Sequence, residues 1–204
     1  RDAIDLSWNE TPGADGYCIF RSIDGGNNYV LLAESSLPNY QDVDIHSNAV
    51  YDYYICAYTD ANSQIMLGKC SDTVKQYTPL DTPVISAAKN VSYNTLRVEW
   101  AVVPGAVGYQ VYRSTTQDGE YTCLTEITDG NTISFDDKTA ECGKTYYYYI
   151  KACQQTEIST LYGEASSVVS GRTTPHRVTL SGSTTQNNTK VSLSWKKVSG
   201  AQGY

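Results

Sequence analysis

The sequence has little of what catalytic sites are usually built from. It contains two histidines, His46 and His176, and no Gly-x-Ser-x-Gly, His-Glu-x-x-His or phosphate-binding loop. General acid–base and nucleophilic catalysis need a base within hydrogen-bond reach of its partner. His46 falls in an expected turn and His176 in an expected joint between domains. We therefore expect no enzyme activity, no catalytic residue and no bound cofactor.

Cysteine is also sparse. The six cysteines are Cys18, Cys56, Cys70, Cys123, Cys142 and Cys153. They contain no C-x-x-C pair, so we expect neither a disulfide scaffold nor a structural zinc site. Cys56 and Cys70 are placed to flank one hairpin, which would allow a bridge in an oxidising compartment. An anaerobic setting would leave all six thiols free.

Long apolar runs and excess positive charge are absent too. No segment reaches the roughly 18 apolar residues of a membrane span, and residues 1–8 do not resemble a signal peptide. Any export signal or anchor is expected outside this segment. The net charge of -7, from 15 Lys and Arg against 22 Asp and Glu, should repel phosphate backbones and anionic lipid. We expect no nucleic acid partner and no membrane insertion.

What is abundant is tyrosine. The chain has 18 Tyr beside 2 Phe and 1 Met, with many Val, Ile and Thr. This composition favours strands over helices. No window shows a sustained helical period, and the connections between the expected strands are short. We therefore predict an all-β, antiparallel protein.

The chain repeats itself. Trp8–Tyr17 (WNETPGADGY) returns as Trp100–Tyr109 (WAVVPGAVGY) and as Trp195–Tyr204 (WKKVSGAQGY), at offsets of 92 and 95 residues. Tyr51–Ala57 (YDYYICA) returns as Tyr146–Ala152 (YYYYIKA) at an offset of 95. A period near 90 residues is too long for a solenoid unit and suits a self-contained sandwich module.

Alternation within each repeat predicts which side chains face the core. The expected inward residues of the first strand are Ile4, Leu6 and Trp8, then Leu96, Val98 and Trp100, then Val191, Leu193 and Trp195. Those of the later tyrosine-rich strand are Tyr51, Tyr53, Ile55 and Ala57, then Tyr146, Tyr148, Ile150 and Ala152. Between the first two strands, the Pro-Gly-Ala-x-Gly turn is explained by backbone geometry, because glycine accepts positive φ.

Proline-marked joints set the expected domain boundaries. Residues 77–83 and 172–176 contain these joints. We predict a module lacking its first strand at 1–80, a complete module at 81–175 and the truncated start of a third module at 176–204.

These blocks together resemble the fibronectin type III domain. They match a tryptophan that ends strand B, a Gly-Tyr-x-Val/Ile-x-Arg-Ser strand C and a Tyr-x-Tyr-x-Ile-x-Ala strand F. The resemblance covers nearly the whole chain, and it is greatest to the tandem modules of large secreted or wall-attached proteins of Gram-positive gut bacteria. It implies tandem immunoglobulin-like sandwiches, with Tyr51 and Tyr146 at the tyrosine corner, hydrogen-bonded to the loop before strand F.

Acidic pairs near two expected strand ends are candidate metal ligands. The pairs are Asp42 with Asp44 and Asp136 with Asp137. Calcium prefers about six to eight oxygen ligands, and two carboxylates fall short of that number. We therefore interpret these residues as solvated turn acids and expect no metal site.

Outward aromatic side chains form the candidate ligand-contact site. Alternation should turn Phe20 and Tyr54 outward in the first module, and Tyr112, Tyr147 and Tyr149 in the second. Such rings can stack on sugars or anchor a protein partner. Outward tyrosines also stabilise sheets through cross-strand pairs, so a purely structural role stays open.

The resemblance implies non-catalytic spacer or interaction modules in an extracellular or cell-surface protein. The expected partners are neighbouring domains of the same chain, and glycans or surface proteins. The alternatives are an adhesin or carbohydrate-binding segment, and accessory domains of a polysaccharide-degrading enzyme. The fold alone does not decide among them.

Overall fold

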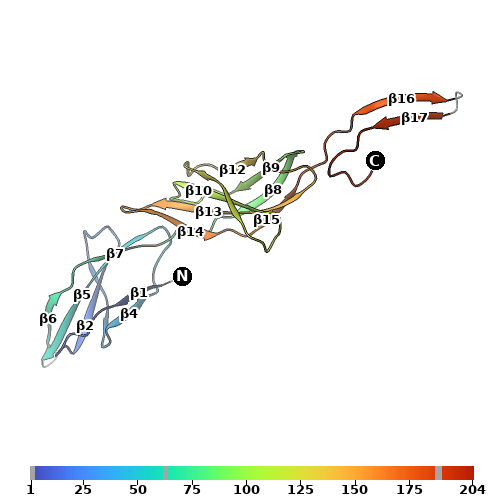
Figure 1. Ribbon diagram of the computed structural model, residues 1–204. Coiled ribbons are helices and arrows are strands. Elements are labelled where there is room, and N and C mark those ends of the chain that lie inside the picture. The colour runs from blue at the N-terminus through green and yellow to red at the C-terminus, as the bar shows by residue number, and fades with distance from the viewer. Residues whose placement is uncertain (1–2, 62–63, 187–189) are drawn as a thin grey trace. The chain divides into compact units, whose positions relative to one another are not determined.

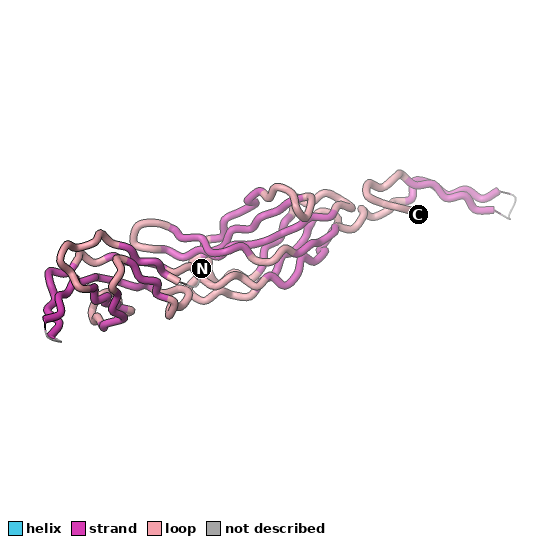
Figure 2. Tube along the Cα trace, turned by 90° about the horizontal axis from the view of Figure 1, so that it is seen from below, coloured by secondary structure: helices cyan, strands magenta, loops and turns pink. Residues whose placement is uncertain are grey.

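The computed structural model describes residues 3–61, 64–186 and 190–204. These residues form seventeen β-strands and no helix, so no helix that could cross a membrane is found among them (Figure 2). All the strand pairings are antiparallel. The predicted all-β antiparallel fold is confirmed. The chain divides into two compact units, residues 1–80 (unit 1) and 81–204 (unit 2).

Unit 1 is a sandwich of two sheets. Its strands are β1 (Ile4–Ser7), β2 (Gly16–Ser22), β3 (Val30–Ser35), β4 (Asn39–Asp42), β5 (Val50–Ala61), β6 (Gln64–Cys70) and β7 (Val74–Tyr77). The smaller sheet pairs β1 with β4, and the larger has the order β3-β2-β5-β6 with β7 also on β5 (Figure 1). Side chains of β1 pack against buried Ile19, Tyr51 and Tyr53 of the larger sheet.

Unit 2 repeats this arrangement with one strand more in its smaller sheet. Its strands are β8 (Ile85–Ser92), β9 (Thr95–Trp100), β10 (Gly108–Ser114), β11 (Thr122–Ile127), β12 (Ser134–Asp137), β13 (Thr145–Gln155), β14 (Thr160–Ala165), β15 (Val169–Arg172), β16 (Leu180–Gln186) and β17 (Lys190–Trp195). One sheet has the order β12-β9-β8, and the other β11-β10-β13-β14 with β15 on β13 (Figure 1). Among the described residues, β16 and β17 pair only with each other.

The additional strand decides how well each core is covered. In unit 2, Leu96, Val98 and Trp100 of β9 are at most 4% exposed. Their counterparts Ile4, Leu6 and Trp8 are only half-buried, as are Ile55 and Ala57, which we expected in the core. The described residues of unit 1 include no strand equivalent to β8. The core of unit 1 is therefore less well covered than that of unit 2. This difference matters because apolar burial is the main stabilising term in a core.

The turn after each tryptophan has the predicted glycine geometry. Gly13, Gly105 and Gly200 have φ of 79°, 81° and 75°. In each copy the NH of the alanine that follows donates to the carbonyl three residues earlier, over 3.1–3.3 Å. Positive φ at the third turn position defines a type II turn, which glycine accepts without steric cost.

Each turn brings a tyrosine ring onto the tryptophan before it. The ring centroids of Trp8 and Tyr17 lie 5.2 Å apart, and those of Trp100 and Tyr109 lie 5.4 Å apart. The tyrosine hydroxyl accepts a hydrogen bond from a backbone NH inside the turn, at Thr11 in unit 1 and at Val103 in unit 2. The buried hydroxyl is therefore satisfied by the turn that positions its ring.

The third copy of this segment has the same local structure. The rings of Trp195 and Tyr204 lie 5.5 Å apart, and the NH of Val198 donates to the Tyr204 hydroxyl. However, Val191 and Leu193 of the β16–β17 hairpin are 68% and 53% exposed. A two-stranded hairpin cannot close a core alone. That residues 176–204 begin a third module stays a prediction, which these exposed side chains support.

The tyrosine corner is confirmed in both units. The Tyr51 hydroxyl accepts a hydrogen bond from the NH of His46 at 2.7 Å, and that of Tyr146 accepts one from the NH of Glu141 at 3.0 Å. Both tyrosines are 2% exposed. The bond fastens the loop before β5 or β13 to the strand itself.

Unit 1 also carries a disulfide. Cys56 and Cys70 lie opposite each other on β5 and β6 and are bonded, so the structure has the bridged alternative. Cys18, Cys123, Cys142 and Cys153 are free. The positions that correspond to the bridge in unit 2 hold Lys151 and Ala165.

Removing the bridge should destabilise unit 1 selectively. We expect Cys56→Ala with Cys70→Ala to lower the free energy of unfolding of unit 1 by about 2–4 kcal/mol, because the 14-residue loop is no longer closed in the unfolded chain. Hydrogen exchange of the full chain, read by mass spectrometry, would report each unit separately. Reduction of the wild type should reproduce the effect, and exposed Cys123→Ala should not. Equal losses in both units would contradict the prediction.

Candidate functional site

Stacked rings occupy the same position on the outer face of both larger sheets. Here the outer face is the one turned away from the smaller sheet. In unit 1, Phe20 of β2 stacks on Tyr54 of β5, with centroids 4.8 Å apart and planes at 17°. In unit 2, Tyr112 of β10 stacks on Tyr149 of β13 at 4.7 Å and 18°. The strand register explains both pairs, because each ring lies directly opposite its partner.

A third ring extends each row, and it lies outside the strands whose alternation predicted the other rings. Tyr29, before β3, lies 4.7 Å from Tyr54, and Tyr121, before β11, lies 4.8 Å from Tyr149. Tyr29 and Tyr121 stand 92 residues apart, the offset of the first repeated block. That shared offset was the signal that could have found them.

Tyr147 does not join the row. It lies between Ser114 of β10 and Ser170 of β15 and has no ring contact within the described part of the chain. Its counterpart in unit 1 is Asp52, which is buried. The structure thus brings together four of the five predicted residues as two pairs and leaves Tyr147 apart. Their contact with a ligand stays a prediction.

The hydroxyls of the unit 2 row are held in their neutral form. Burial, followed by the nearby Cys123, raises the pKa of Tyr112 and Tyr149, and burial, followed by Asp118, raises the pKa of Tyr121. The Tyr112 hydroxyl donates to Oε1 of Gln110 at 2.8 Å. The row therefore offers uncharged rings beside an oriented amide.

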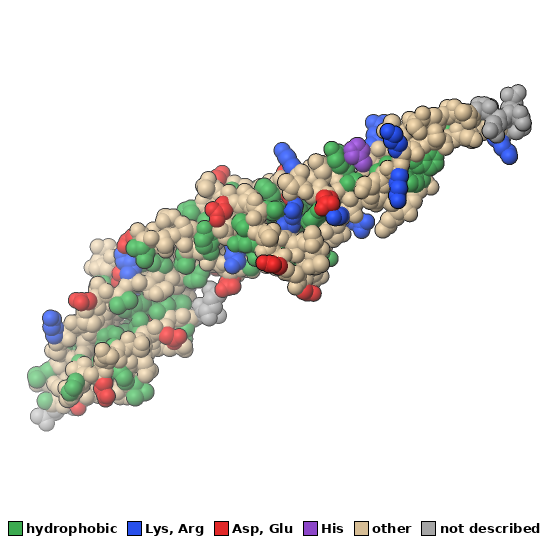
Figure 3. All heavy atoms as spheres, in the orientation of Figure 1, with side chains coloured by type: hydrophobic (Ala, Val, Ile, Leu, Met, Phe, Trp, Pro, Cys, Tyr) green, Lys and Arg blue, Asp and Glu red, His purple; other side chains and the backbone are tan. Residues whose placement is uncertain are grey.

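On the face drawn in Figure 3, acidic, basic and hydrophobic side chains are interspersed among other surface atoms. In the part of the chain that the structure describes, no group of three or more His, Cys, Asp or Glu is arranged to hold a metal ion. His176 is exposed, and its ring lies 4.2 Å from that of Tyr93.

The interpretation of Asp42 and Asp137 as solvated turn acids is wrong. Both are 1% exposed, and each accepts a hydrogen bond of 2.7 Å from a core tyrosine, Tyr53 or Tyr148. Both end the strand that lies beside the first tryptophan strand, where they face inward and not into solvent. The interpretation holds for Asp44, whose side chain is 77% exposed.

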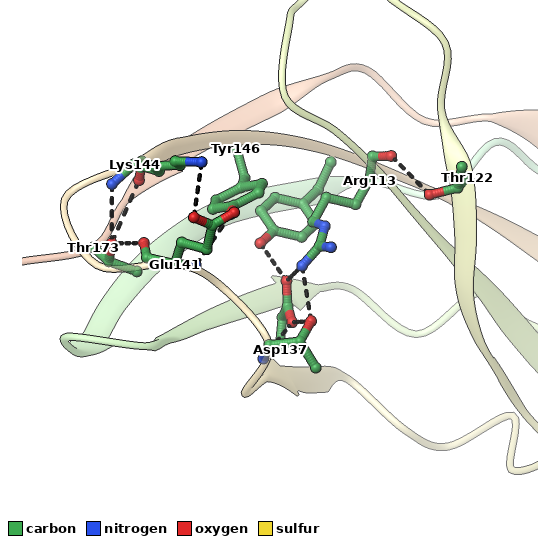
Figure 4. Close-up of polar contacts among 9 residues, drawn as sticks. Arg113, Thr122, Asp137, Glu141, Lys144, Tyr146 and Thr173 are labelled. Carbon is green, nitrogen blue, oxygen red and sulfur yellow. Dashed lines mark hydrogen bonds and ion pairs between the residues drawn. The ribbon is translucent and has the colours of Figure 1, made fainter.

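An arginine at the same position of each unit neutralises the buried carboxylate. Arg113 Nη1 lies 2.8 Å from Asp137 Oδ2 and donates to the Thr139 hydroxyl at 2.9 Å (Figure 4). Its guanidinium also lies 4.7 Å from the centre of the Tyr146 ring. Arg21 makes the same pair with Asp42 at 2.9 Å. These arginines stand in the Arg-Ser motif of the repeat, and the sequence analysis assigned them no partner.

In the cluster of Asp137, Arg113 and Tyr148, the carboxyl group of Asp137 stays charged and the phenol of Tyr148 stays neutral. Burial raises the pKa of Asp137, but hydrogen bonds from Thr139, Tyr148 and Arg113 outweigh it and hold that pKa below its usual value. Burial and the hydrogen bond to Asp137 raise the pKa of Tyr148. In both units the carboxylate accepts hydrogen bonds from the guanidinium and the phenol, so the three groups form a structural cluster.

Asp136 is different from its neighbour. It forms a two-point ion pair with Arg97, with Nε to Oδ1 at 2.6 Å and Nη2 to Oδ2 at 2.9 Å. The Arg97 side chain is 45% exposed and that of Asp136 is 29% exposed. Asp136 and Asp137 are therefore not two ligands of one site, because they pair with arginines on different strands.

Asp137→Asn should destabilise unit 2 by about 2–4 kcal/mol, because it leaves the Arg113 guanidinium without an anionic partner. The folded pKa of Asp137 is lowered, so its stabilisation is present above the unfolded pKa of about 3.9 and is lost as the pH falls through the folded pKa. Urea unfolding between pH 7 and pH 2 should show the two proteins converging at low pH. Asp136→Asn, the matched control, should cost less than about 1 kcal/mol. A difference that does not narrow as the pH falls would contradict this.

A double-mutant cycle tests whether the rings of the aromatic row stabilise the sheet, which is the structural alternative to ligand contact. Tyr112→Ala and Tyr149→Ala should show a coupling of about 0.5–1.5 kcal/mol in urea unfolding, because the rings stack. Tyr112→Ala with Tyr147→Ala should be additive within about 0.5 kcal/mol. A coupling near zero for the stacked pair would remove the structural explanation of these rings.

Comparisons with known proteins bear on the fold. No family model and no curated protein matches the chain. A two-domain fibronectin type III segment of chicken tenascin is similar at 17% identity and a TM-score of 0.51, over 85% of this chain and 92% of that one. Domains FN1–FN3 of chicken CNTN1 match at 17% identity and a TM-score of 0.41, over 85% of this chain and 63% of that one. An Fn3-like protein from Clostridium thermocellum matches at 28% identity and a TM-score of 0.39, over 45% of this chain and 90% of that one. The likeness to tenascin shows that this chain has the fold of tandem fibronectin type III domains.

Proposed function

We propose that the chain is a set of non-catalytic modules that space and orient neighbouring domains in a larger extracellular or cell-surface protein of bacterial origin. Modules of this fold are typically spacer or interaction domains. The disulfide between Cys56 and Cys70 supports an oxidising, extracellular setting, because such bridges are rare inside cells. The expected partners are the adjoining domains of the same chain.

The observation that carries the spacer role is how the chain leaves each sandwich. Thr78 follows β7, and Thr173 follows β15, 95 residues later. Their hydroxyls donate to the carbonyls of His46 and Glu141, each at 2.6 Å. Both threonines are at most 4% exposed.

The backbone reinforces this connection. The NH of Thr78 donates to Ala49 O at 2.9 Å, and that of Thr173 donates to Lys144 O at 3.1 Å (Figure 4 shows the second). The exit segment is therefore fastened to the loop that holds the tyrosine corner. A fixed direction of exit, followed by the proline of each joint, is what a semi-rigid spacer needs.

Thr78→Val tests this proposal, because it keeps the shape of the side chain and removes the hydroxyl. We expect about 1–3 kcal/mol of destabilisation from the unpaired His46 carbonyl, and faster backbone motion at residues 79–84. ¹⁵N relaxation of the full chain would measure that motion as a fall in the heteronuclear NOE at Leu80, Asp81, Thr82 and Val84, since Pro79 and Pro83 have no backbone NH.

The matched control is Thr82→Val, at an exposed position of the same joint. It should leave the relaxation unchanged. High mobility of residues 79–84 already in the wild type, or no change on Thr78→Val, would contradict a fastened exit and with it the spacer role.

Glycan binding is the second candidate function, either in an adhesin or in an accessory module of a polysaccharide-degrading enzyme. The observation that favours it is the row of neutral tyrosines beside Gln110 on the outer face of unit 2. Stacked rings next to an oriented amide suit a ligand that has both apolar faces and hydroxyls.

A further inference from the structure

A groove of about 420 Å³ opens on unit 2, at the end of the larger sheet where β10 and β14 begin. This volume lies within the range of about 300–1,000 Å³ that is usual for small-molecule sites. The lining residues used below are Gln110, Glu126, Cys153, Gln155, Thr160 and Tyr162. They come from four strands or strand ends of one sheet, so a rigid scaffold positions them.

Unit 1 has a ring where unit 2 has the groove. Cys153 lies opposite Gly108 on β10, and the residues with the same pairing in unit 1 are Tyr58 and Gly16. The Tyr58 ring covers Gly16 so closely that a Cβ on that glycine would lie 2.6 Å from the tyrosine hydroxyl. In unit 2 the much smaller Cys153 stands at this position, and a Cβ on Gly108 would instead meet the backbone carbonyl of Ile127, which lines the groove.

The polar groups of the groove are already oriented. Gln110 Nε2 donates to Glu126 Oε1 at 2.6 Å, and the Thr160 hydroxyl donates to Gln155 Oε1 at 3.1 Å. These bonds fix both amides before any ligand arrives, which reduces the entropy lost on binding. Burial, followed by Glu126, raises the pKa of Tyr162 and of Cys153, so both side chains are uncharged at neutral pH.

The composition of the lining selects the class of ligand. Among the described residues that line the groove there is one carboxylate, Glu126, and no Lys or Arg, so an anion would find no counter-charge. One carboxylate is also too few for a metal ion. A purely apolar ligand would desolvate two amides and a carboxylate without replacing their hydrogen bonds. A pyranose ring can stack its C–H face on Tyr162, which is 42% exposed, and offer hydroxyls to the amides and Glu126.

We propose that this groove binds a neutral glycan chain that continues along the tyrosine row. Gln110 joins the two parts, because it contacts Glu126 in the groove and accepts from the Tyr112 hydroxyl at 2.8 Å. Cys153 and Tyr149 are four residues apart on β13, a span of about 13 Å at ~3.3 Å per residue. That length exceeds one sugar ring, so an oligosaccharide is the better occupant. The site goes beyond the spacer role, which stands whether or not the groove binds.

The test uses the full chain with cellohexaose, xylohexaose and mannohexaose as neutral probes. Hexagalacturonate and a Gly-Ser hexapeptide serve as charged and peptide controls. We expect saturable binding of at least one neutral probe, with a dissociation constant of about 1 mM or lower in isothermal titration. Cys153→Tyr, which installs the residue that unit 1 carries at this position, should weaken binding at least about tenfold by filling the groove.

Tyr162→Ala provides a second variant at a more exposed position, in case Cys153→Tyr does not fold. Its matched control is Tyr93→Ala, also 42% exposed and in unit 2 but outside the groove. We expect Tyr162→Ala to weaken binding at least about tenfold and Tyr93→Ala to leave it unchanged, with circular dichroism verifying the fold of each variant.

Three results would overturn the proposal. The first is no binding of any neutral probe at millimolar concentration. The second is binding that survives in folded groove variants, or that falls equally in Tyr93→Ala. The third is binding of only hexagalacturonate or only the peptide, which would assign the groove to another ligand class. Because the spacer role is tested by relaxation of the Thr78 variant, the two proposals fail separately.

Discussion

The hydroxyl groups of buried tyrosines are the constraint on which this structure depends. Each core is built on tyrosine, with Tyr17, Tyr51 and Tyr53 in unit 1 and Tyr109, Tyr146 and Tyr148 in unit 2 all at most 3% exposed. A buried hydroxyl without a partner would cost about 1–3 kcal/mol. Turn NH groups satisfy the first tyrosine of each unit, corner NH groups the second, and buried aspartates the third.

The buried aspartates require further contacts of their own. A carboxylate that accepts from a core tyrosine must itself be buried, and a buried charge requires a counter-charge. Arg21 and Arg113 provide it at the edge of each sandwich. The recurring Arg-Ser motif is therefore explained by the tyrosine core, and it does not indicate a ligand site.

The differences between the units are where function is to be sought, since the shared features follow from the fold. Unit 1 has a disulfide and a ring at Tyr58, whereas unit 2 has an open groove at Cys153. Both units fasten their exit segments through a buried threonine, which fits a spacer. In the proposed roles, one array would set the reach of neighbouring domains through its joints and present a ligand surface on one module only.

The sequence by itself determined the all-β class, the repeat, the glycine turns and the outward aromatic side chains, because these depend on local backbone chemistry and on the period-2 alternation of strands. The tyrosine corner followed from the resemblance to the fibronectin type III domain. Only the tertiary structure decided that Asp42 and Asp137 are buried, that Tyr29 and Tyr121 complete the aromatic rows, and that a groove opens in unit 2. Burial and enclosure arise between strands that are distant in the chain. A periodic pattern can assign a side chain to a face, but it cannot show what covers that face.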